Sequence, residues 1–277
     1  MPDYVINLDA YCARIGYLGE RTPTLATLRD ILRGHATSIP FENLDVLLGR
    51  RISIEPSAVE QKLVHDRRGG YCFEQSTLMM HALRELGFDV SPLIGRIRWQ
   101  VPPDVLTNLG HMRLRVDLGG VAYVADPGLG SLTLTAPLEL AERGEQNTHL
   151  ERRRLIPEGA FLREQVNFGE SWSDVCIFSP DAASLPDFEL GNWYYCTHPE
   201  SLFVRNLVVA RPAKDRRYSI FNREFAVRHA DGSSVKEIIA SPEQLRSLLH
   251  EHFGLDLDPG LKLQCPGLDF GETDRTE

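Results

Sequence analysis

The sequence predicts an α+β fold in which helices come first and an antiparallel sheet or barrel follows. Three observations support this prediction: apolar residues recur at helical spacing in the first third, short strand-like runs follow one another after Gly87, and the last third mixes strands with a helix. Because no helices separate the middle strands, an antiparallel arrangement is favoured over a doubly wound parallel sheet. A prior of about 150 residues per domain predicts one or two domains for 277 residues.

The first third predicts three helices. Apolar spacing over residues 25–32 indicates the first of them. Ser57-Ala-Val-Glu60 has the form of a capping box, which opens the second. The third begins at Cys72, keeps one apolar face and ends at Gly87, a residue typical of helix C-termini.

Strands are predicted from short apolar runs. In the middle third these runs cover residues 90–99, 112–116, 121–125, 154–156 and 172–178, and in the last third 202–209, 218–221, 225–228 and 235–239. Gly119-Gly120 and Asp231-Gly232 lie between neighbouring runs and predict hairpin turns. Ser241-Pro242 opens a final helix, and the polar tail from Asp269 is expected to fray.

The charge balance limits the kinds of partner. Acidic residues outnumber basic ones by 39 to 30, giving a formal net charge of −9. A surface built to neutralise nucleic-acid phosphates or anionic lipid is therefore not expected. No apolar run approaches the roughly 20 residues that span a bilayer, and the N-terminus has acids where a signal peptide has bases. We expect a cytoplasmic protein.

The five cysteines form no pattern among themselves. Their number is odd, and their wide spacing includes no C-x-x-C pair, so neither a disulfide scaffold nor a zinc site is expected. No other cluster has metal-ligand spacing. Four thiols are expected to act as small buried hydrophobes, and the exception is Cys72.

Cys72 has the features of a nucleophile. Gly69-Gly70 permits a tight turn just before it, and the periodic segment after it makes Cys72 the first residue of a helix. Backbone N–H groups and the helix dipole stabilise a thiolate at that position, and the neighbouring arginines would add to this effect. The alternative is that Gly69-Gly70 is only a loop and Cys72 a core residue.

A base and an orienting acid are expected from one strand pair. His111 begins an apolar run and Asp126 ends the next, with a hairpin between them, so the two side chains should meet at one end of the pair. The other eight histidines are expected on the surface or in the core. Gly128 and Gly130 follow Asp126, and this spacing lets a ligand or another backbone approach closely, although an ordinary turn would also use it.

These residues resemble those of a known family, the arylamine N-acetyltransferases. The resemblance rests on five motifs in family order, which cover the chain from about residue 8 to about residue 255: Ser38-Ile-Pro-Phe-Glu-Asn-Leu44, Arg68-Gly-Gly-Tyr-Cys-Phe-Glu74, His111, Asp126-x-Gly128-x-Gly130 and Thr197-His-Pro-x-Ser-x-Phe203. Five motifs in order are far more specific than any one of them.

The resemblance implies a fold of three parts around a cysteine-protease-like Cys-His-Asp core. These are a helical domain carrying the nucleophile (residues 1–87), a β-barrel-like domain carrying His and Asp (88–200), and an α/β lid with a frayed acidic tail (201–277). It also implies transfer of acetyl from acetyl-CoA to arylamines, arylhydrazines or arylhydroxylamines by a ping-pong route, with no metal. Xenobiotic metabolism is the implied setting.

The resemblance further assigns roles to residues. Cys72 would accept the acetyl group, His111 would form an ion pair with it and Asp126 would fix the imidazole. Phe41 and Phe203 would line the acceptor pocket, with core packing as the alternative. The backbone of Gly128 and Gly130 is the better candidate for CoA contacts, since the basic residues are more often a solvated face; these are Arg67, Arg68, Arg211, Lys214, Arg216 and Arg217.

Departures from the family pattern keep alternatives open. Pro127 and Leu129 stand where Val and Phe are common, and Ser76 where Asn is common, which leaves acceptor preference and CoA seating undetermined. One alternative is an amide synthase of the same fold that uses a carrier-bound acyl thioester. A second is a papain- or transglutaminase-like hydrolase with the same three residue types. A third is a binding module that has lost turnover, with Pro127 and Leu129 as marks of decay.

Overall fold

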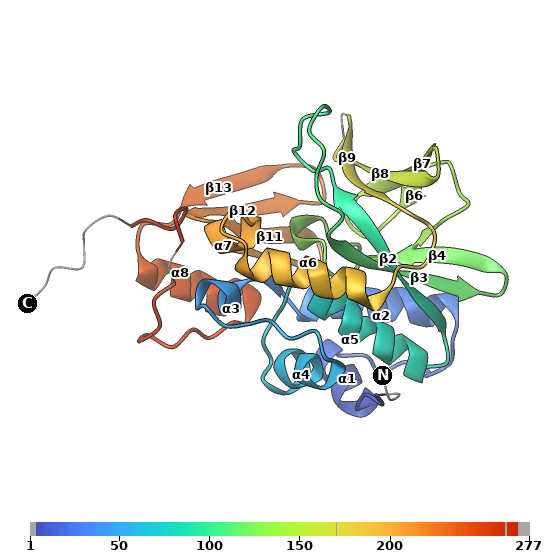
Figure 1. Ribbon diagram of the computed structural model, residues 1–277, viewed down its shortest axis with the longest axis horizontal. Helices are drawn as coiled ribbons and strands as arrows, with labels where there is room; N and C mark the ends of the chain where they lie inside the picture. Colours follow the sequence, from blue (N-terminus) through green and yellow to red (C-terminus); the bar gives the residue numbers. More distant parts are fainter. Residues whose placement is uncertain (1–3, 170, 264, 271–277) are drawn as a thin grey trace, which may run out of the picture.

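The computed structural model describes residues 4–169, 171–263 and 265–270. Helices make up the first third, as predicted, and lie beneath the strands in the view of Figure 1. They are α1 (Leu8–Ile15), α2 (Leu25–Ser38), α3 (Leu44–Leu47), α4 (Pro56–Glu60), which continues into the π-helical turn η1 (Gln61–His65), and α5 (Cys72–Glu85). Gly87 follows α5 with a φ of +87°, the left-handed conformation expected of a glycine just past a helix end.

The capping box predicted at Ser57 is wrong, although the helix exists. Its first residue is Pro56, because a proline suits the first helical position, where its missing N–H costs no hydrogen bond. Glu60 instead turns toward the N-terminal segment. Its carboxylate accepts hydrogen bonds from the Tyr4 hydroxyl at 2.7 Å and from the backbone N–H of Asn7 at 3.1 Å.

An eight-stranded antiparallel sheet follows and curls into a nearly closed barrel. Its strand order is β5-β4-β3-β2-β9-β8-β7-β6. The bounds are β2 (Asp89–Ile97), β3 (His111–Leu118), β4 (Val121–Ala125), β5 (Leu138–Glu139), β6 (Gln146–Asn147), β7 (Arg152–Glu158), β8 (Phe161–Asn167) and β9 (Trp172–Phe178), with the short 3₁₀ turn η2 (Gly130–Leu132) after β4. The side-chain amide of Gln146 joins the two edge strands, since it bonds both the N–H (2.7 Å) and the C=O (3.0 Å) of Glu139.

A second antiparallel sheet of five strands, in the order β1-β10-β11-β12-β13, lies to the left in Figure 1. Its members are β1 (Phe41–Glu42), β10 (Val208–Pro212), β11 (Arg216–Phe221), β12 (Glu224–His229) and β13 (Ser234–Ile238). The accompanying helices are α6 (Leu185–Thr197), α7 (Leu202–Arg205) and α8 (Pro242–Leu248), which continues into the π-helical turn η3 (Leu249–Phe253). Strand β1 comes from the helical first third, so the two parts share a sheet. The division at residues 87 and 200 stays a prediction.

The strand predicted over residues 202–209 is partly wrong. Its first half is α7, because the Ser201 hydroxyl caps that helix by accepting from the N–H of Phe203 at 3.2 Å. Helices α1 and α6 and strand β8 were not predicted. The frayed tail was predicted over residues 269–277, of which 271–277 lie outside the described residues.

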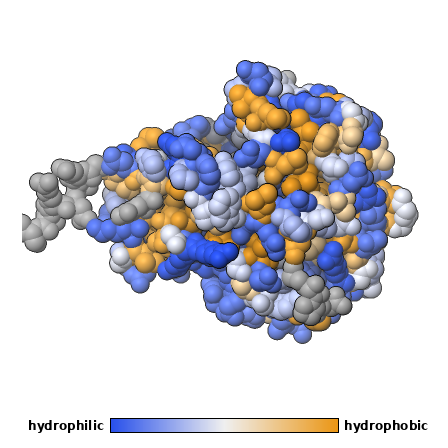
Figure 2. Space-filling model, in the orientation of Figure 1, coloured by the Kyte–Doolittle hydropathy of each residue, from blue (hydrophilic) through white to orange (hydrophobic). Residues whose placement is uncertain are grey.

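Two apolar cores follow this arrangement. The larger joins helices α1, α2 and α5 to the barrel strands, and the smaller lies under the five-stranded sheet and α8. Figure 2 shows hydrophilic and apolar residues interspersed over one face of the molecule. Within the described ranges, no helix is both long and apolar enough to cross a bilayer.

Candidate active site

The Cys72 thiol lies at the first residue of α5, as the sequence predicts, and is 4% exposed. The turn before it is fixed by Glu74, whose Oε2 accepts from the N–H of Tyr71 at 3.1 Å. Gly70 is required there, because a Cβ at this position would lie 2.7 Å from that same oxygen. The glycine turn therefore presents Cys72 at the helix N-terminus, where free backbone N–H groups favour negative charge.

His111 and Asp126 meet at one end of a strand pair. The register of β3 and β4 pairs Leu114 with Ala125, so Asp126 continues past the end of β4 beside the start of β3. His111 Nε2 lies 2.7 Å from Asp126 Oδ2, and both side chains are buried. The imidazole also interacts with the Cys72 thiol. Because Nε2 is taken by the carboxylate, Nδ1 is the nitrogen left for sulfur.

Electrostatics favour a charged imidazole. Burial opposes the imidazolium, but the charge and hydrogen bond of Asp126, together with the contact to Cys72, outweigh burial and raise the pKa of His111 to about 9. Burial likewise opposes the Asp126 carboxylate, but His111 and Arg113 hold the pKa of Asp126 below its usual value. The geometry thus suits an imidazolium held by the Asp126 carboxylate beside the Cys72 side chain.

The two glycines after Asp126 lie next to different residues. Gly128 packs on Cys72, since a Cβ there would lie 2.7 Å from Cys72 Cα, and its N–H donates to Asp126 Oδ1 at 3.3 Å. Gly130 has a φ of +58°, and a Cβ added there would lie 3.9 Å from the Phe41 ring. The loop that follows Asp126 therefore reaches both the thiol and the first aromatic predicted to bind substrate.

Phe41 and Phe203 lie together although they are far apart in the sequence. Their ring centroids are 5.8 Å apart, and Phe203 also contacts Tyr71 at 5.4 Å and Tyr195 at 5.6 Å. Tyr195 is close enough to Cys72 to interact with its charge, and burial followed by that charge raises the pKa of Tyr195 to about 12. Sequence reasoning missed Tyr195, because the helix that carries it was itself not predicted.

Asn43 in the first motif and Ser76, just after the second, hold the site together. The Asn43 amide donates to the carbonyls of Phe203 (2.7 Å) and Asn206 (2.8 Å) and accepts from the N–H of Val208 (2.8 Å). The Ser76 hydroxyl donates to the carbonyl of Met112 at 3.0 Å and so ties α5 to β3. Asn43 and Ser76 thus fix the nucleophile helix and α7 relative to the sheets.

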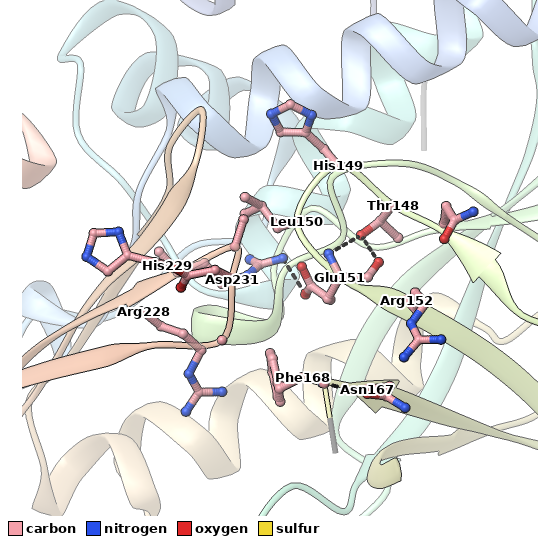
Figure 3. A pocket seen from close by; sticks show the side chains of 15 residues that line it. Thr148, His149, Leu150, Glu151, Arg152, Asn167, Phe168, Arg228, His229 and Asp231 are labelled. Carbon is pink, nitrogen blue, oxygen red and sulfur yellow. Dashed lines mark hydrogen bonds and ion pairs between the residues drawn. The ribbon is translucent and has the colours of Figure 1, made fainter. Parts of the chain in front are cut away.

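Three of the six basic residues considered for CoA phosphates form ion pairs with carboxylates. Arg68 bonds Glu42 and Asp45 rather than approaching Cys72, and Arg216 pairs with Asp215. Arg217 bonds Glu151 at the edge of a cavity of about 350 Å³ between the barrel and the five-stranded sheet. In Figure 3 the side chains of Glu151, Arg228 and Phe168 are among those that line this cavity.

The remaining cysteines carry no further site. All five thiols are free; Cys12 and Cys176 are buried like Cys72, as expected, but Cys196 and Cys265 are only partly buried. Among the described residues, no group of three or more His, Cys, Asp or Glu side chains is arranged to hold a metal.

Comparison with known proteins identifies the family. The N-acetyltransferase family model matches residues 24–261. The chain is 38% identical over 256 residues to the arylamine N-acetyltransferase of Mycolicibacterium smegmatis, covering 91% of this chain and 93% of that protein. It is 37% identical to the arylamine N-acetyltransferase / N-hydroxyarylamine O-acetyltransferase of Salmonella typhimurium, covering 91% of this chain and 89% of that one.

A solved structure agrees with these relatives. The arylamine N-acetyltransferase of Mycobacterium marinum in complex with CoA superposes with a TM-score of 0.86 at 36% identity, covering 90% of this chain and 92% of that chain. The chain belongs to the arylamine N-acetyltransferase family.

Proposed function

We propose that this enzyme transfers acetyl from acetyl-CoA to the nitrogen of arylamines, arylhydrazines or arylhydroxylamines through an acetyl-Cys72 intermediate. One observation carries the proposal: the buried His111–Asp126 hydrogen bond of 2.7 Å, with Cys72 close enough to interact with the imidazole. The names of the relatives support the acceptor class, and the CoA complex of the M. marinum enzyme supports the donor. Because the named relatives are acetyltransferases, the amide synthase alternative is not favoured.

The first half-reaction loads the enzyme. The Cys72 thiolate attacks the thioester carbonyl of acetyl-CoA, and the tetrahedral intermediate collapses with loss of the CoA thiolate. The His111 imidazolium gives its proton to that leaving sulfur. One C–S bond forms and one breaks, so the exchange between two thioesters is nearly isoenergetic and can be driven by the acceptor that follows.

The second half-reaction unloads it. The nitrogen of the acceptor attacks the acetyl-Cys72 carbonyl while neutral His111 takes up the proton that the nitrogen loses, and the Cys72 thiolate leaves. Asp126 keeps the imidazole oriented and stabilises it whenever it is charged. Phe41 and Phe203 offer an aromatic acceptor a face of matching shape, and the burial of Cys72 limits competing hydrolysis.

CoA is expected to pass along the Asp126-Pro-Gly-Leu-Gly130 loop. Gly128 lies directly against Cys72, so a pantetheine sulfur that reaches the thiol must come close to this segment. In the same proposal, residues 1–87 carry the nucleophile, 88–200 the His and Asp, and 201–277 a lid. The reaction needs only groups on this chain and the two substrates.

The test is a mass measurement of the acetyl-enzyme. Wild-type protein incubated with acetyl-CoA alone should release one equivalent of CoA thiol and gain one acetyl group on the peptide that contains Cys72. Addition of an arylhydrazine should then make CoA release catalytic. Cys72→Ala should abolish both results, while Cys265→Ala, which removes a partly buried thiol from the smaller core, should preserve them.

Two further results separate the alternatives. Iodoacetamide at pH 6 should alkylate Cys72 faster than the other four cysteines, and His111→Ala should remove the difference. Equal rates for all five thiols in the wild type would favour a binding module without turnover. A folded protein that neither releases CoA nor becomes acetylated would contradict the acetyltransferase proposal and return attention to a carrier-bound donor or a hydrolase.

A further inference from the structure

The triad carboxylate has a second cationic partner inside the barrel. Arg113 lies two residues beyond His111 on β3, so both side chains leave the same face of the strand. Arg113 Nε is 3.1 Å from Asp126 Oδ2, the same oxygen that His111 Nε2 contacts at 2.7 Å. Two positively charged groups thus share one carboxylate oxygen in a fully buried site.

Arg113 is in turn held by a carboxylate from across the barrel. Its Nη2 lies 2.5 Å from Oε2 of Glu164 on β8, and its guanidinium stacks over the Phe178 ring at 4.3 Å. Arg113 and Glu164 side chains are both 0% exposed. An arginine buried to this degree requires a counter-charge, and Glu164 and Asp126 divide that task.

The pairing continues to the other sheet. Glu164 Oε1 contacts Arg153 at 2.6 Å, Arg153 contacts Glu151 at 2.6 Å, and Arg217 on β11 contacts the same Glu151 oxygen at 2.6 Å. Acid and base alternate along the row, so three carboxylates balance three guanidinium groups. The Glu151–Arg217 end of the row lines the cavity of Figure 3.

We propose that Glu164 is a positioning residue of the triad that acts through Arg113. Arg113 holds Asp126 in place but competes with His111 for Oδ2. The negative charge of Glu164 partly neutralises the Arg113 guanidinium. This weakens the pull of Arg113 on Oδ2, and Asp126 can then stabilise the imidazolium of His111. The inference rests on the proposed roles of Cys72, His111 and Asp126.

Few other ionisable groups face this cluster. Besides Asp126, the imidazole meets the Cys72 thiol from α5. Arg113 is faced by Asp126, by Glu164 and by Cys176 on β9. Burial, only partly offset by Arg113, raises the pKa of Cys176 to about 12, so this thiol stays neutral over the working pH range. The charges of Arg113 and Glu164 are therefore the adjustable ones next to Asp126.

The proposal predicts that substitutions at Glu164 and at Arg113 shift the pKa of His111 in opposite directions. Glu164→Gln leaves Arg113 with surplus positive charge, and should lower the pH at which His111 loses its proton by about one unit. Arg113→Met removes the competitor and should raise that pH. The double variant restores the balance and should titrate close to the wild type. A loss of packing alone would loosen the His111–Asp126 contact and lower the value in all three proteins.

The measurement is an NMR titration of the His111 ring, identified by its absence from a His111→Gln spectrum. The matched control is Glu151→Gln, which removes a buried carboxylate from Arg153 and Arg217 but not from Arg113, and should give a much smaller shift. Where one single variant does not fold, the double variant is compared with the other single variant: a return of the His111 titration toward the wild-type pH supports the proposal, and equal titrations in the two would contradict it.

The same titrations test the role of Glu164 separately from the roles of Cys72, His111 and Asp126. A wild-type His111 that titrates near the ordinary histidine value would contradict the triad itself. A wild-type value near 9, with Glu164→Gln and Arg113→Met shifted in the same direction, would overturn only the role of Glu164. In the supported case, the alkaline limb of acetyl transfer should also move to lower pH in Glu164→Gln.

Discussion

Gly128 lies so close to Cys72 that a Cβ at position 128 would be 2.7 Å from the Cys72 Cα. The contact joins the loop after Asp126 to the first turn of α5. It explains why a glycine is needed here on grounds of space, since no positive φ is found at this residue. The loop and the first turn of α5 are therefore packed directly against each other.

We predict that Gly128→Ala displaces Cys72 and lowers kcat/KM for acetyl-CoA at least tenfold, a change of about 1.4 kcal/mol in transition-state stabilisation. Steady-state kinetics with a fixed arylamine would measure it. Gly260→Ala is the control, because a Cβ there meets only the end of the Asp258 side chain at 3.3 Å. Unchanged kinetics in Gly128→Ala would mean that the loop gives way without cost.

The raised pKa of His111 makes stability depend on pH in a defined direction. The imidazole has a pKa of about 9 in the folded protein against 6.5 ordinarily, so its contribution is fully present below about pH 6.5 and is lost as the pH rises through 9. The loss amounts to at most about 3 kcal/mol. Urea unfolding between pH 6 and 9.5 should show it in the wild type.

Asp126→Asn provides the comparison for this titration. The amide keeps the shape of the carboxylate but removes the charge that stabilises the imidazolium, so the decline in unfolding free energy between pH 6.5 and 9 should flatten. An equally steep decline in this variant would show that other groups cause it.

Much of the site could be predicted from the sequence, because its signals are local. Gly69-Gly70 before Cys72, and a short hairpin between His111 and Asp126, require no knowledge of distant segments. Strand β8 could not be found in the same way. Its inward-facing position 164 carries a glutamate where an apolar residue would complete the alternation, and this charge is tolerated only because Arg113 and Arg153 arrive from other strands.

The role of Asn43 was likewise out of reach, because its partners lie more than 150 residues away. The first motif singled out Asn43, but it gave no indication of the residues to which the Asn43 side chain is hydrogen-bonded. Residues 202–209 have a strand-like composition, and only the cap at Ser201 starts a helix there. Long-range hydrogen bonds therefore determine the role of Asn43, and a side-chain cap overrides the strand propensity of residues 202–209.

The aromatic pair should control how the acceptor binds. We predict that Phe203→Leu raises KM for an arylamine about fivefold, roughly 1 kcal/mol, while the rate of acetyl-enzyme formation changes little. The reason is that Phe203 contacts Phe41, Tyr71 and Tyr195 but takes no part in the chemistry. Stopped-flow acetylation and steady-state acceptor kinetics measure the two quantities separately.

A control distinguishes binding from core packing. Phe188→Leu changes a buried aromatic that contacts Phe73 rather than the Phe41–Phe203 pair. It should reduce thermal stability without altering KM for the acceptor. If Phe203→Leu behaved in the same way, its ring would serve only as packing between the two sheets.

Asn43 ties the first third of the chain to α7 and β10 by three hydrogen bonds and is 2% exposed. Asn43→Ala leaves two carbonyls and one N–H without this partner, so the free energy of unfolding should fall by about 3 kcal/mol. Because one of those carbonyls belongs to Phe203, KM for the arylamine should rise as well. Asn7→Ala removes a single exposed cap bond and should cost only about 1 kcal/mol, with kinetics unchanged. Urea unfolding and acceptor kinetics on both variants test this, and equal losses in the two would contradict a bridging role for Asn43.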